Sequence, residues 1–478
     1  MTAALRIARA EWGYWRHSRL LLAALAVFGL LLAATAVLSA ARIESEAARR
    51  AAQQQAAEQA FTAQPDRHPH RMVHYGHYVF RTPPPLAVFD PGIDAVAGQA
   101  LFLEGHRQNS AAFAEAPSAA GVGAFGVPHP ALAYQLLVPL LLIALGHAAF
   151  AREREAGTLA PLLAQGLRPG QLAAGKAIAL GIAALAMLLP AVGLAVLAVV
   201  DGESPAIAAL QVLLYAGYLG AWVLAVLLLG ALLPRRADVL GALLLAWLAT
   251  ALVLPRLAAS HAVAAVPASG KIAADIALLE GLRNAGDGHN AADPAFDALR
   301  RQLLAQHGVE RVEDLPVNFR GMVATIAEER LTALLNEAAE RRMAQERAQS
   351  ARLAAFAWAS PTLATGIASR ALAGTDLLAM HRFQRESEAL RFEFVQGLNQ
   401  VHAHALRYAD DIQRSVDPEA ERRTRVDASH WRLLRAFTFE PAAPAARRAN
   451  ASAAGAALAA WLLALALGLH LAVARLRP

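Results

Sequence analysis

The chain has 478 residues, of which 56% are hydrophobic, and its mean hydropathy is +0.36, a composition that favours the membrane class over soluble proteins. It contains no cysteine, which excludes disulfides, thiolate metal sites and cysteine nucleophiles. The formal charge of +6 comes almost entirely from arginine, which genome base composition can enrich, so it does not indicate a nucleic-acid partner.

Residues 1–19 precede the first apolar run and have the pattern of a cytosolic amphipathic helix. Trp12, Tyr14 and Trp15 suit the interface of a membrane, and the arginines around them suit anionic headgroups. We expect this interfacial helix to contact membrane lipids, either as a simple anchor or with a role in gating.

Six apolar runs reach the length of about 20 residues that an α-helix needs to cross a bilayer. The first is interpreted as a retained span, because residues 1–19 are long for the basic region of a signal peptide. The sequence therefore predicts an all-α membrane protein with six transmembrane helices and a mostly helical periplasmic domain. The predicted spans are 20–41, 131–150, 178–200, 206–233, 239–258 and 451–473.

Arginine and lysine residues gather on one side of the membrane if the six spans alternate. They lie before the first span, in the loop 151–177, between the fourth and fifth spans, and in the tail 474–478. The bias of positive charge toward the cytosol places both termini inside. Arg42 and the pair Arg447–Arg448 fall on the outer side and break the pattern, although long loops count little in this rule.

Two large segments, 42–130 and 259–450, then face outward. The first begins with a helical stretch rich in alanine and glutamine, 42–60, and becomes proline-rich at Pro83–Pro85. The second contains a long amphipathic run over 318–358, which Pro361 ends, and a further predicted helix over 376–415.

Histidines are dense in the first outer segment, where the sequence reads HPHRMVHYGHYVF. Histidines at this density can bind zinc or copper outside the cell. The spacing matches no strict ligand pattern and no carboxylate is interleaved, so a packed aromatic loop is the better interpretation. His402 and His404 give still weaker signals. The candidate metal ligands are His68, His70, His74 and His77.

Motifs for catalysis, or for a source of energy within the chain, are missing. Residues 170–177 read GQLAAGKA and nearly form a phosphate loop, but Ala177 replaces the Ser or Thr that would bind magnesium, and no strand precedes them. The better interpretation is a turn with a snorkelling Lys176 at a helix start. Common enzyme motifs are absent, so we expect no ATPase site in this chain. The spans contain almost no ionisable residue, so the energy for any transport would have to come from outside them.

The loop between the second and third spans reads AREREAGTLAPLLAQGLRPGQLAAGK and is the strongest candidate for contact with a partner. Its charges can pair with a docking subunit, Gly157 allows a tight turn, Thr158 can cap the following helix, and three leucines form an apolar face. A solvated loop with a helix resting on the membrane is an equally good interpretation from physics alone. The candidate residues are Glu153, Arg154, Glu155, Gly157, Thr158, Leu159, Leu162 and Leu163.

This loop closely resembles the one that follows the second span in permease subunits of type-2 ABC exporters, which typically reads E-x-E-x-G-T-L, then a Leu-Leu pair, then Gly-Lys. Segments 74–92 and 359–391 are similar to the outer regions of a bacterial subgroup with two enlarged periplasmic loops. The resemblance implies a multi-pass protein of the bacterial inner membrane with cytoplasmic termini. It also implies that loop 151–177 contains the coupling helix.

The resemblance further implies the partners. A separate cytosolic ATP-binding subunit would bind ATP and magnesium, so this chain would need no cofactor of its own, and a second permease would complete a homo- or heterodimer. The enlarged outer segments leave two hypotheses open. One is an exporter of an unidentified substrate. The other is a membrane-anchored mechanotransmission or scaffold protein with a periplasmic partner and no transported substrate.

Overall fold

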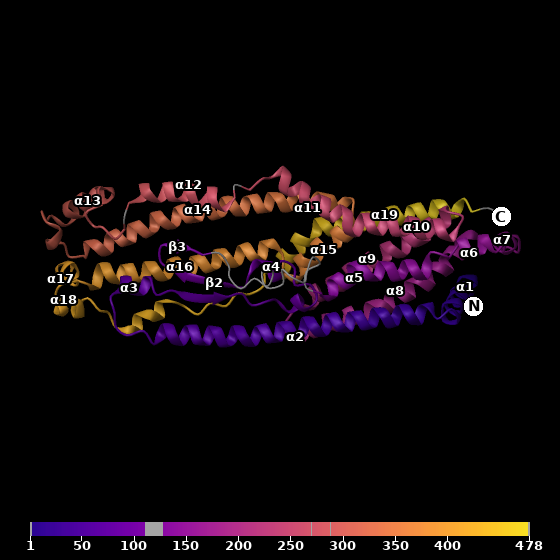
Figure 1. The fold of residues 1–478 in the computed structure, drawn as a ribbon, viewed down its shortest axis with the longest axis horizontal. Coiled ribbons are helices and arrows are strands. Elements are labelled where there is room, and N and C mark those ends of the chain that lie inside the picture. Colours follow the sequence, from indigo (N-terminus) through magenta and orange to yellow (C-terminus); the bar gives the residue numbers. More distant parts are fainter. Residues whose placement is uncertain (1, 110–127, 269, 287, 477–478) are drawn as a thin grey trace.

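The computed structural model describes residues 2–476 except 110–127, 269 and 287. Within these residues the chain is a long bundle of helices that run nearly parallel to one axis (Figure 1). Helices make up 77% of it and strands very little, which confirms the predicted all-α class.

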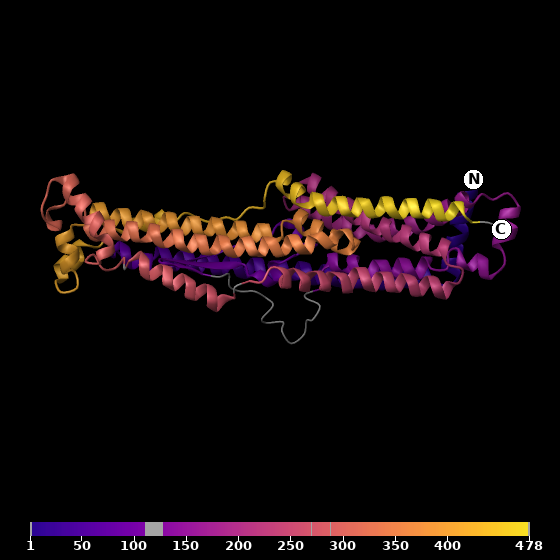
Figure 2. The same cartoon turned by 90° about the horizontal axis from the view of Figure 1, so that it is seen from above.

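The two ends of the molecule carry different elements. Both chain termini lie at one end, together with the hairpin of α6 (Ala151–Glu155) and α7 (Leu159–Ala164). The opposite end is formed by α13 (Asp297–His307), α17 (Tyr408–Gln413) and α18 (Pro418–Arg423), as Figures 1 and 2 show. The predicted coupling loop therefore lies at the end that is farthest from the outer helices.

Six helical segments of the described chain are long and apolar enough to cross a membrane, which confirms the predicted number. Five of them exceed the predicted spans because the helix continues past its apolar run, and the first includes the stretch 42–60 without a break. The fourth, Pro205–Leu232, has the predicted length. The segments are α2 (Leu20–Thr62), α5 (Pro130–Gly146) continued by α6, α8 (Pro169–Val200), α9 (Pro205–Leu232), the run of α10 (Arg236–Trp247), η2 (Leu248–Val253) and α11 (Leu254–Ala265), and α19 (Pro444–Ala474).

The fifth segment changes its helix type near the middle. Residues of η2 form a π-helical turn that ends two residues before Pro255, whose ring nitrogen has no hydrogen to donate. The carbonyl of Thr250 in this turn accepts a hydrogen bond from the hydroxyl of Ser360. The local irregularity thus joins a membrane helix to the outer segment 259–450.

Helix α1 (Ala3–His17) packs against protein on one face. Trp15 is 2% exposed and its Nε1 donates to the carbonyl of Leu145 at 3.0 Å, and Glu11 is also buried. Tyr14 and the arginines remain exposed. Trp15, which was expected at a membrane interface, is therefore buried within the helix bundle.

The outer region is built on an antiparallel pair, α14 (Phe319–Ala355) and α16 (Leu377–Ala405) (Figure 1). These helices correspond to the runs expected over 318–358 and 376–415, but the second ends at Ala405. The remaining elements of this region are α3 (Pro69–Val73), η1 (Pro85–Val88), α4 (Asp94–Ala97), α12 (Lys271–Ala285), η3 (Pro294–Phe296), η4 (Val312–Asp314), η5 (Phe356–Trp358), α15 (Pro361–Ala373) and η6 (Ala428–Leu433).

A small antiparallel sheet, which the sequence did not predict, lies against α16. Its strands β1 (His77–Phe80), β2 (Ala100–Glu104) and β3 (Arg107–Gln108) pair in the order β1-β2-β3. Side chains of the sheet share a buried cluster with Met380 and Phe383 of α16. Strands of two to five residues are too short for a clear alternation of apolar and polar residues.

Arg447, one of the residues that broke the charge rule, is buried in an ion pair at the outer end of the bundle. Its guanidinium donates to both carboxylate oxygens of Glu203, at 2.9 and 2.8 Å, and also to the carbonyl of Leu372. The pair joins the start of α19 to the turn between α8 and α9. The charge of Arg447 is thus neutralised by Glu203 and is not exposed on the surface.

Replacing Glu203 by glutamine should destabilise the protein by about 3–5 kcal/mol, because Arg447 would remain buried without a counter-charge. Thermal unfolding of the purified chain in detergent measures this loss. Asp201→Asn, which alters an exposed acidic residue of the same turn, is the control. Equal melting temperatures for the two variants would contradict the assignment.

Candidate coupling site and histidine clusters

The α6–α7 hairpin turns at Gly157, whose φ of +67° lies in the left-handed region that glycine adopts without strain. The sequence predicted that Thr158 would cap α7, but its hydroxyl instead donates to the carbonyl of Glu153. Leu159 is buried, Leu162 and Leu163 are half-buried, and a row of small neutral residues is exposed. The exposed residues are Ala156, Gly157, Thr158, Ala160, Pro161, Ala164, Gln165 and Gly166.

Lys176 is buried between two carboxylates and does not snorkel, so that interpretation of the sequence was wrong. Its Nζ donates to Oε1 of Glu11 at 2.6 Å and to Oε1 of Glu153 at 2.8 Å. Arg152 also donates to Glu11, at 2.7 Å, so two cations balance two anions. Residues 170–177 are helical throughout, which removes the phosphate-loop hypothesis.

Gly175 explains how α1 comes close enough to α8 for this network. A Cβ atom at position 175 would lie 2.7 Å from the carbonyl oxygen of Ala4 and 2.6 Å from the Cβ of Ile7. Only glycine fits at such a backbone approach. The adjacent pair Gly175 and Lys176 therefore joins α1 to α8 by close packing and by charge.

Arg154 and Glu155 secure the hairpin to the turn between α9 and α10. Arg154 donates to the carbonyls of Gly230 and Leu233, at 2.8 and 2.7 Å, at the end of α9. Glu155 accepts hydrogen bonds from the backbone and side chain of Arg236 at the start of α10. Both contacts suit the partial charges of helix ends. These charges, which the sequence suggested were offered to a partner, are paired within the chain.

Replacing Lys176 by methionine should cost about 3–5 kcal/mol of stability, because Glu11 and Glu153 would lose their shared cation. We expect a lower melting temperature and faster protease cleavage between α1 and α2 in detergent. Arg168→Met, which removes an exposed cation from the same segment, is the matched control. If both variants behave like the native chain, the network does not hold α1 in place.

A buried polar cluster near the outer end of the bundle was not expected from the sequence. Ser369 of α15 accepts hydrogen bonds from Gln211 and Tyr215 of α9, at 2.8 and 3.1 Å, and donates to Asp90. Gln135 of α5 donates to the hydroxyl of Tyr215 at 2.9 Å. Two polar residues of α9, Gln211 and Tyr215, are thus bonded to an outer segment. The sequence gives no signal that Asp90 and Ser369 meet.

The structure divides the four candidate histidines. His68 joins His402 and Asp411 in a buried group, His70 and His74 join His106 and His289, and the ring of His77 packs 5.2 Å from that of Phe61. Only His70 and His74, of the four candidates, belong to the same group.

The buried group is a hydrogen-bond network around one carboxylate. Asp411 contacts Nε2 of His402 at 2.8 Å and Nε2 of His68 at 3.1 Å, and it also accepts a bond from the side chain of Asn318. Burial alone would raise the pKa of Asp411, but the bonds from the two histidines hold it well below its ordinary value. Burial lowers the pKa of His68 to about 4, although its bond to Asp411 acts in the opposite direction.

The second group brings four imidazoles together. All six pairs of ring centroids lie between 4.8 Å, for His70 and His74, and 5.7 Å, for His74 and His289. Burial and the neighbouring imidazoles lower the pKa of His70 to about 2 and lower that of His74. At neutral pH these two rings are therefore uncharged.

Asp411→Asn should destabilise the protein by about 3 kcal/mol at pH 7, because an amide cannot accept both histidine bonds and leaves buried donors unmet. The folded-state pKa of Asp411 is depressed, so its contribution is present above about pH 4 and is lost as the pH falls further. Melting curves from pH 7 to 3 should show the difference from the native chain shrinking.

Asp410→Asn is the control for this comparison, because Asp410 pairs with a half-exposed Arg423 and should contribute at most about 1 kcal/mol. A difference between the native chain and Asp411→Asn that stays constant down to pH 3 would contradict the assignment.

Two family models match parts of the chain. Residues 5–279, more than half of the chain, match a family described as ABC-2 family transporter protein. Residues 271–440 match a domain of unknown function, DUF3526. No curated protein matches the chain. The first match includes the α6–α7 hairpin, and the second includes α14, α16 and His289.

Proposed function

Because the chain belongs to the ABC-2 transporter family, and is thus the membrane permease subunit of an ABC transporter, we propose that its α6–α7 hairpin docks a cytosolic ATP-binding subunit. That subunit binds ATP and magnesium, and its hydrolysis of ATP drives export of a substrate across a bacterial inner membrane. A second permease, identical or related, completes the transporter.

The observation that carries this proposal is the anchoring of α6. Three consecutive residues connect it to three other helices: Glu153 to Lys176 of α8, Arg154 to the end of α9, and Glu155 to the start of α10. Helix α6 also extends the span that begins with α5. A force applied to the hairpin would therefore reach several membrane helices through short, charged contacts.

The exposed side of the hairpin suits a protein contact. Ala160, Pro161 and Ala164 form a small, neutral surface on α7, while the charged side chains of α6 point back toward the bundle. Such a surface can enter a groove without leaving buried charge unpaired. This arrangement supports docking through α7 and transmission through α6.

The positions of the termini support the proposed orientation. Both termini lie at the end of the molecule that carries the hairpin (Figure 1). The arginines of this end, including Arg6, Arg9 and Arg475, fit the cytosolic side of a membrane. The domain of segment 259–450 then lies in the periplasm.

The surface of the bundle leaves room for a second permease. Leu185, Leu189 and Val196 of α8 are between 58% and 66% exposed. Apolar side chains of this kind face lipid or another membrane helix. They are consistent with a homo- or heterodimer in a lipid bilayer.

One observation favours mechanotransmission as a second candidate function. Helix α2 is continuous from the inner end of the bundle to Thr62 in the outer region, and its outer part contacts β1 and η6. Movement of the bundle would therefore reach the outer region directly, where a periplasmic partner could respond without any transported substrate.

The docking proposal predicts that Ala160→Arg will weaken coupling. In proteoliposomes that contain the chain and its ATP-binding subunit, we expect the stimulation of ATPase activity over the free subunit to fall at least about fivefold. The added guanidinium would meet the partner surface, while the fold is unchanged because Ala160 is exposed. Glu155→Ala should keep docking but also lower the stimulation, because α10 is released.

Ala305→Arg is the matched control, since it adds the same charge to an exposed alanine of α13 at the opposite end. Co-purification measures docking separately from ATPase stimulation. Normal co-purification and normal stimulation in both hairpin variants would rule out the proposed role.

A further inference from the structure

Four histidines converge in the outer region, at a distance from the hairpin. One nitrogen from each of His70, His74, His106 and His289 lies within 4.8 Å of the others, and the Nε2 atoms of His70 and His74 are 3.2 Å apart. Tetrahedral zinc bound to imidazoles at about 2.0–2.1 Å brings neighbouring nitrogens to about 3.3 Å. Small side-chain rotations would therefore complete such a site.

The backbone holds these residues in place by close packing. His70 and His74 are one helical turn apart at α3. Gly105 donates its N–H to the carbonyl of Val73, and a Cβ atom at position 105 would lie 2.1 Å from the Val73 side chain. This contact presses the β2–β3 turn onto α3 and presents His106, whose φ is +65°.

His289 is positioned in the same way. It follows Gly288, where a Cβ atom would lie 2.6 Å from the Cβ of Ala327 on α14. Two of the four histidines thus directly follow a glycine that packs too closely for any other residue. These two glycines bring side chains from distant parts of the sequence to one point.

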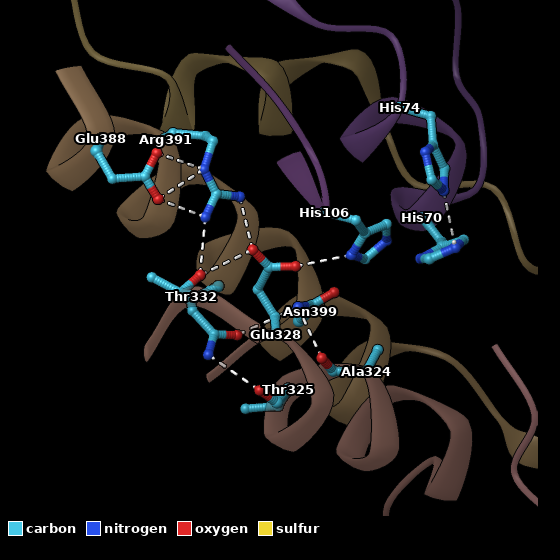
Figure 3. A network of polar contacts seen from close by, with 11 residues as sticks. His70, His74, His106, Ala324, Thr325, Glu328, Thr332, Glu388, Arg391 and Asn399 are labelled. Atoms are coloured by element: carbon cyan, nitrogen blue, oxygen red, sulfur yellow. Dashed lines mark hydrogen bonds and ion pairs between the residues drawn. The ribbon is translucent and has the colours of Figure 1, made fainter. Parts of the chain in front are cut away.

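His106 is oriented by a buried carboxylate, as metal-bound histidines usually are. Its Nδ1 lies 2.8 Å from Oε2 of Glu328, which is fully buried and is held in turn by Arg391 and Thr332 (Figure 3). When Nδ1–H donates a hydrogen bond to this carboxylate, the neutral ring has its lone pair on Nε2. Among the described residues, this buried Nε2 has no hydrogen-bond partner.

We propose that His70, His74, His106 and His289 bind a divalent late first-row transition metal ion, with zinc as the best fit. Four imidazole ligands and no oxygen ligand favour zinc, copper or nickel over magnesium or calcium. Four protein ligands also close the coordination shell, which is the arrangement of structural rather than catalytic zinc.

The other histidine group is a poorer metal site. The Nε2 atoms of His68 and His402 both face the carboxylate of Asp411, and Nδ1 of His68 accepts the backbone N–H of His70 at 3.1 Å. Hydrogen bonds within the chain thus account for both Nε2 atoms and for the second nitrogen of His68. The two groups therefore differ in chemistry, although His68 of one and His70 of the other are only two residues apart.

The metal ion would join the two outer segments. His70, His74 and His106 come from segment 42–130, whereas His289 comes from segment 259–450 and follows α12. The bound ion therefore fixes the stretch between α12 and η3 onto α3 and the β2–β3 turn. Because segment 42–130 alone lacks His289, only the full chain contains the complete site.

The test is metal binding by the full chain, purified in detergent through a tag without histidine. After treatment with a chelator, the protein is dialysed against zinc, copper or nickel, and bound metal is measured by mass spectrometry. We expect about one equivalent of zinc, and a cobalt-substituted sample with the strong visible absorption of four-coordinate cobalt. If copper or nickel binds more tightly through the same four histidines, the proposed site is supported and the assignment of zinc is wrong.

The variants identify the ligands. His106→Ala and His289→Ala should each lose the bound metal, and Glu328→Gln should weaken zinc binding about 10- to 100-fold through His106. His404→Ala and Glu329→Gln, which alter exposed neighbours, should bind like the native chain. The proposal is overturned if the native chain retains no metal, or if the ligand variants bind as it does. No nucleotide is used, so the result is independent of the coupling proposal.

Discussion

Charge inside a bundle of membrane helices has to be neutralised where it lies, and this constraint determines how the helices of this protein are joined. Lys176 and Arg152 balance Glu11 and Glu153 at the inner end, and Arg447 balances Glu203 at the outer end. Breaking such a pair is costly because an isolated ion cannot return to water. Each pair therefore fixes helices that simple apolar packing would leave free to slide.

The buried polar contacts lie in two groups, one at each end of the bundle. At the inner end, α6 is bonded to α8, α9 and α10, so the hairpin cannot shift without them. At the outer end, Ser369 of α15 accepts hydrogen bonds from Gln211 and Tyr215 of α9, and Tyr215 in turn accepts one from Gln135 of α5. The hairpin and the outer segments are thus both bonded to α9. Because of these bonds, the large outer segments and the membrane helices are joined through the same helix.

Local patterns were sufficient for the spans and for the two long outer helices, because apolar length and helical spacing are properties of neighbouring residues. They failed for Lys176, since its partner Glu11 is 165 residues away and a lone lysine at a helix start ordinarily reaches water. They also failed for the histidines: His70 and His74 were suggested by their density, but His106 and His289 are isolated in the sequence. Close packing at Gly105 and Gly288 brings His106 and His289 to the other two histidines, and a periodic pattern in the sequence cannot predict such packing.

The unbroken α2 helix has a geometric consequence. Its 43 residues correspond to a rod of about 65 Å at 1.5 Å per residue. A tilt of only about 5° around its inner end would carry its far tip sideways by about 6 Å, which exceeds the pitch of a helical turn. A small tilt of α2 at the end near α1 would therefore move Thr62 at its other end by several ångströms, together with the elements that this end contacts.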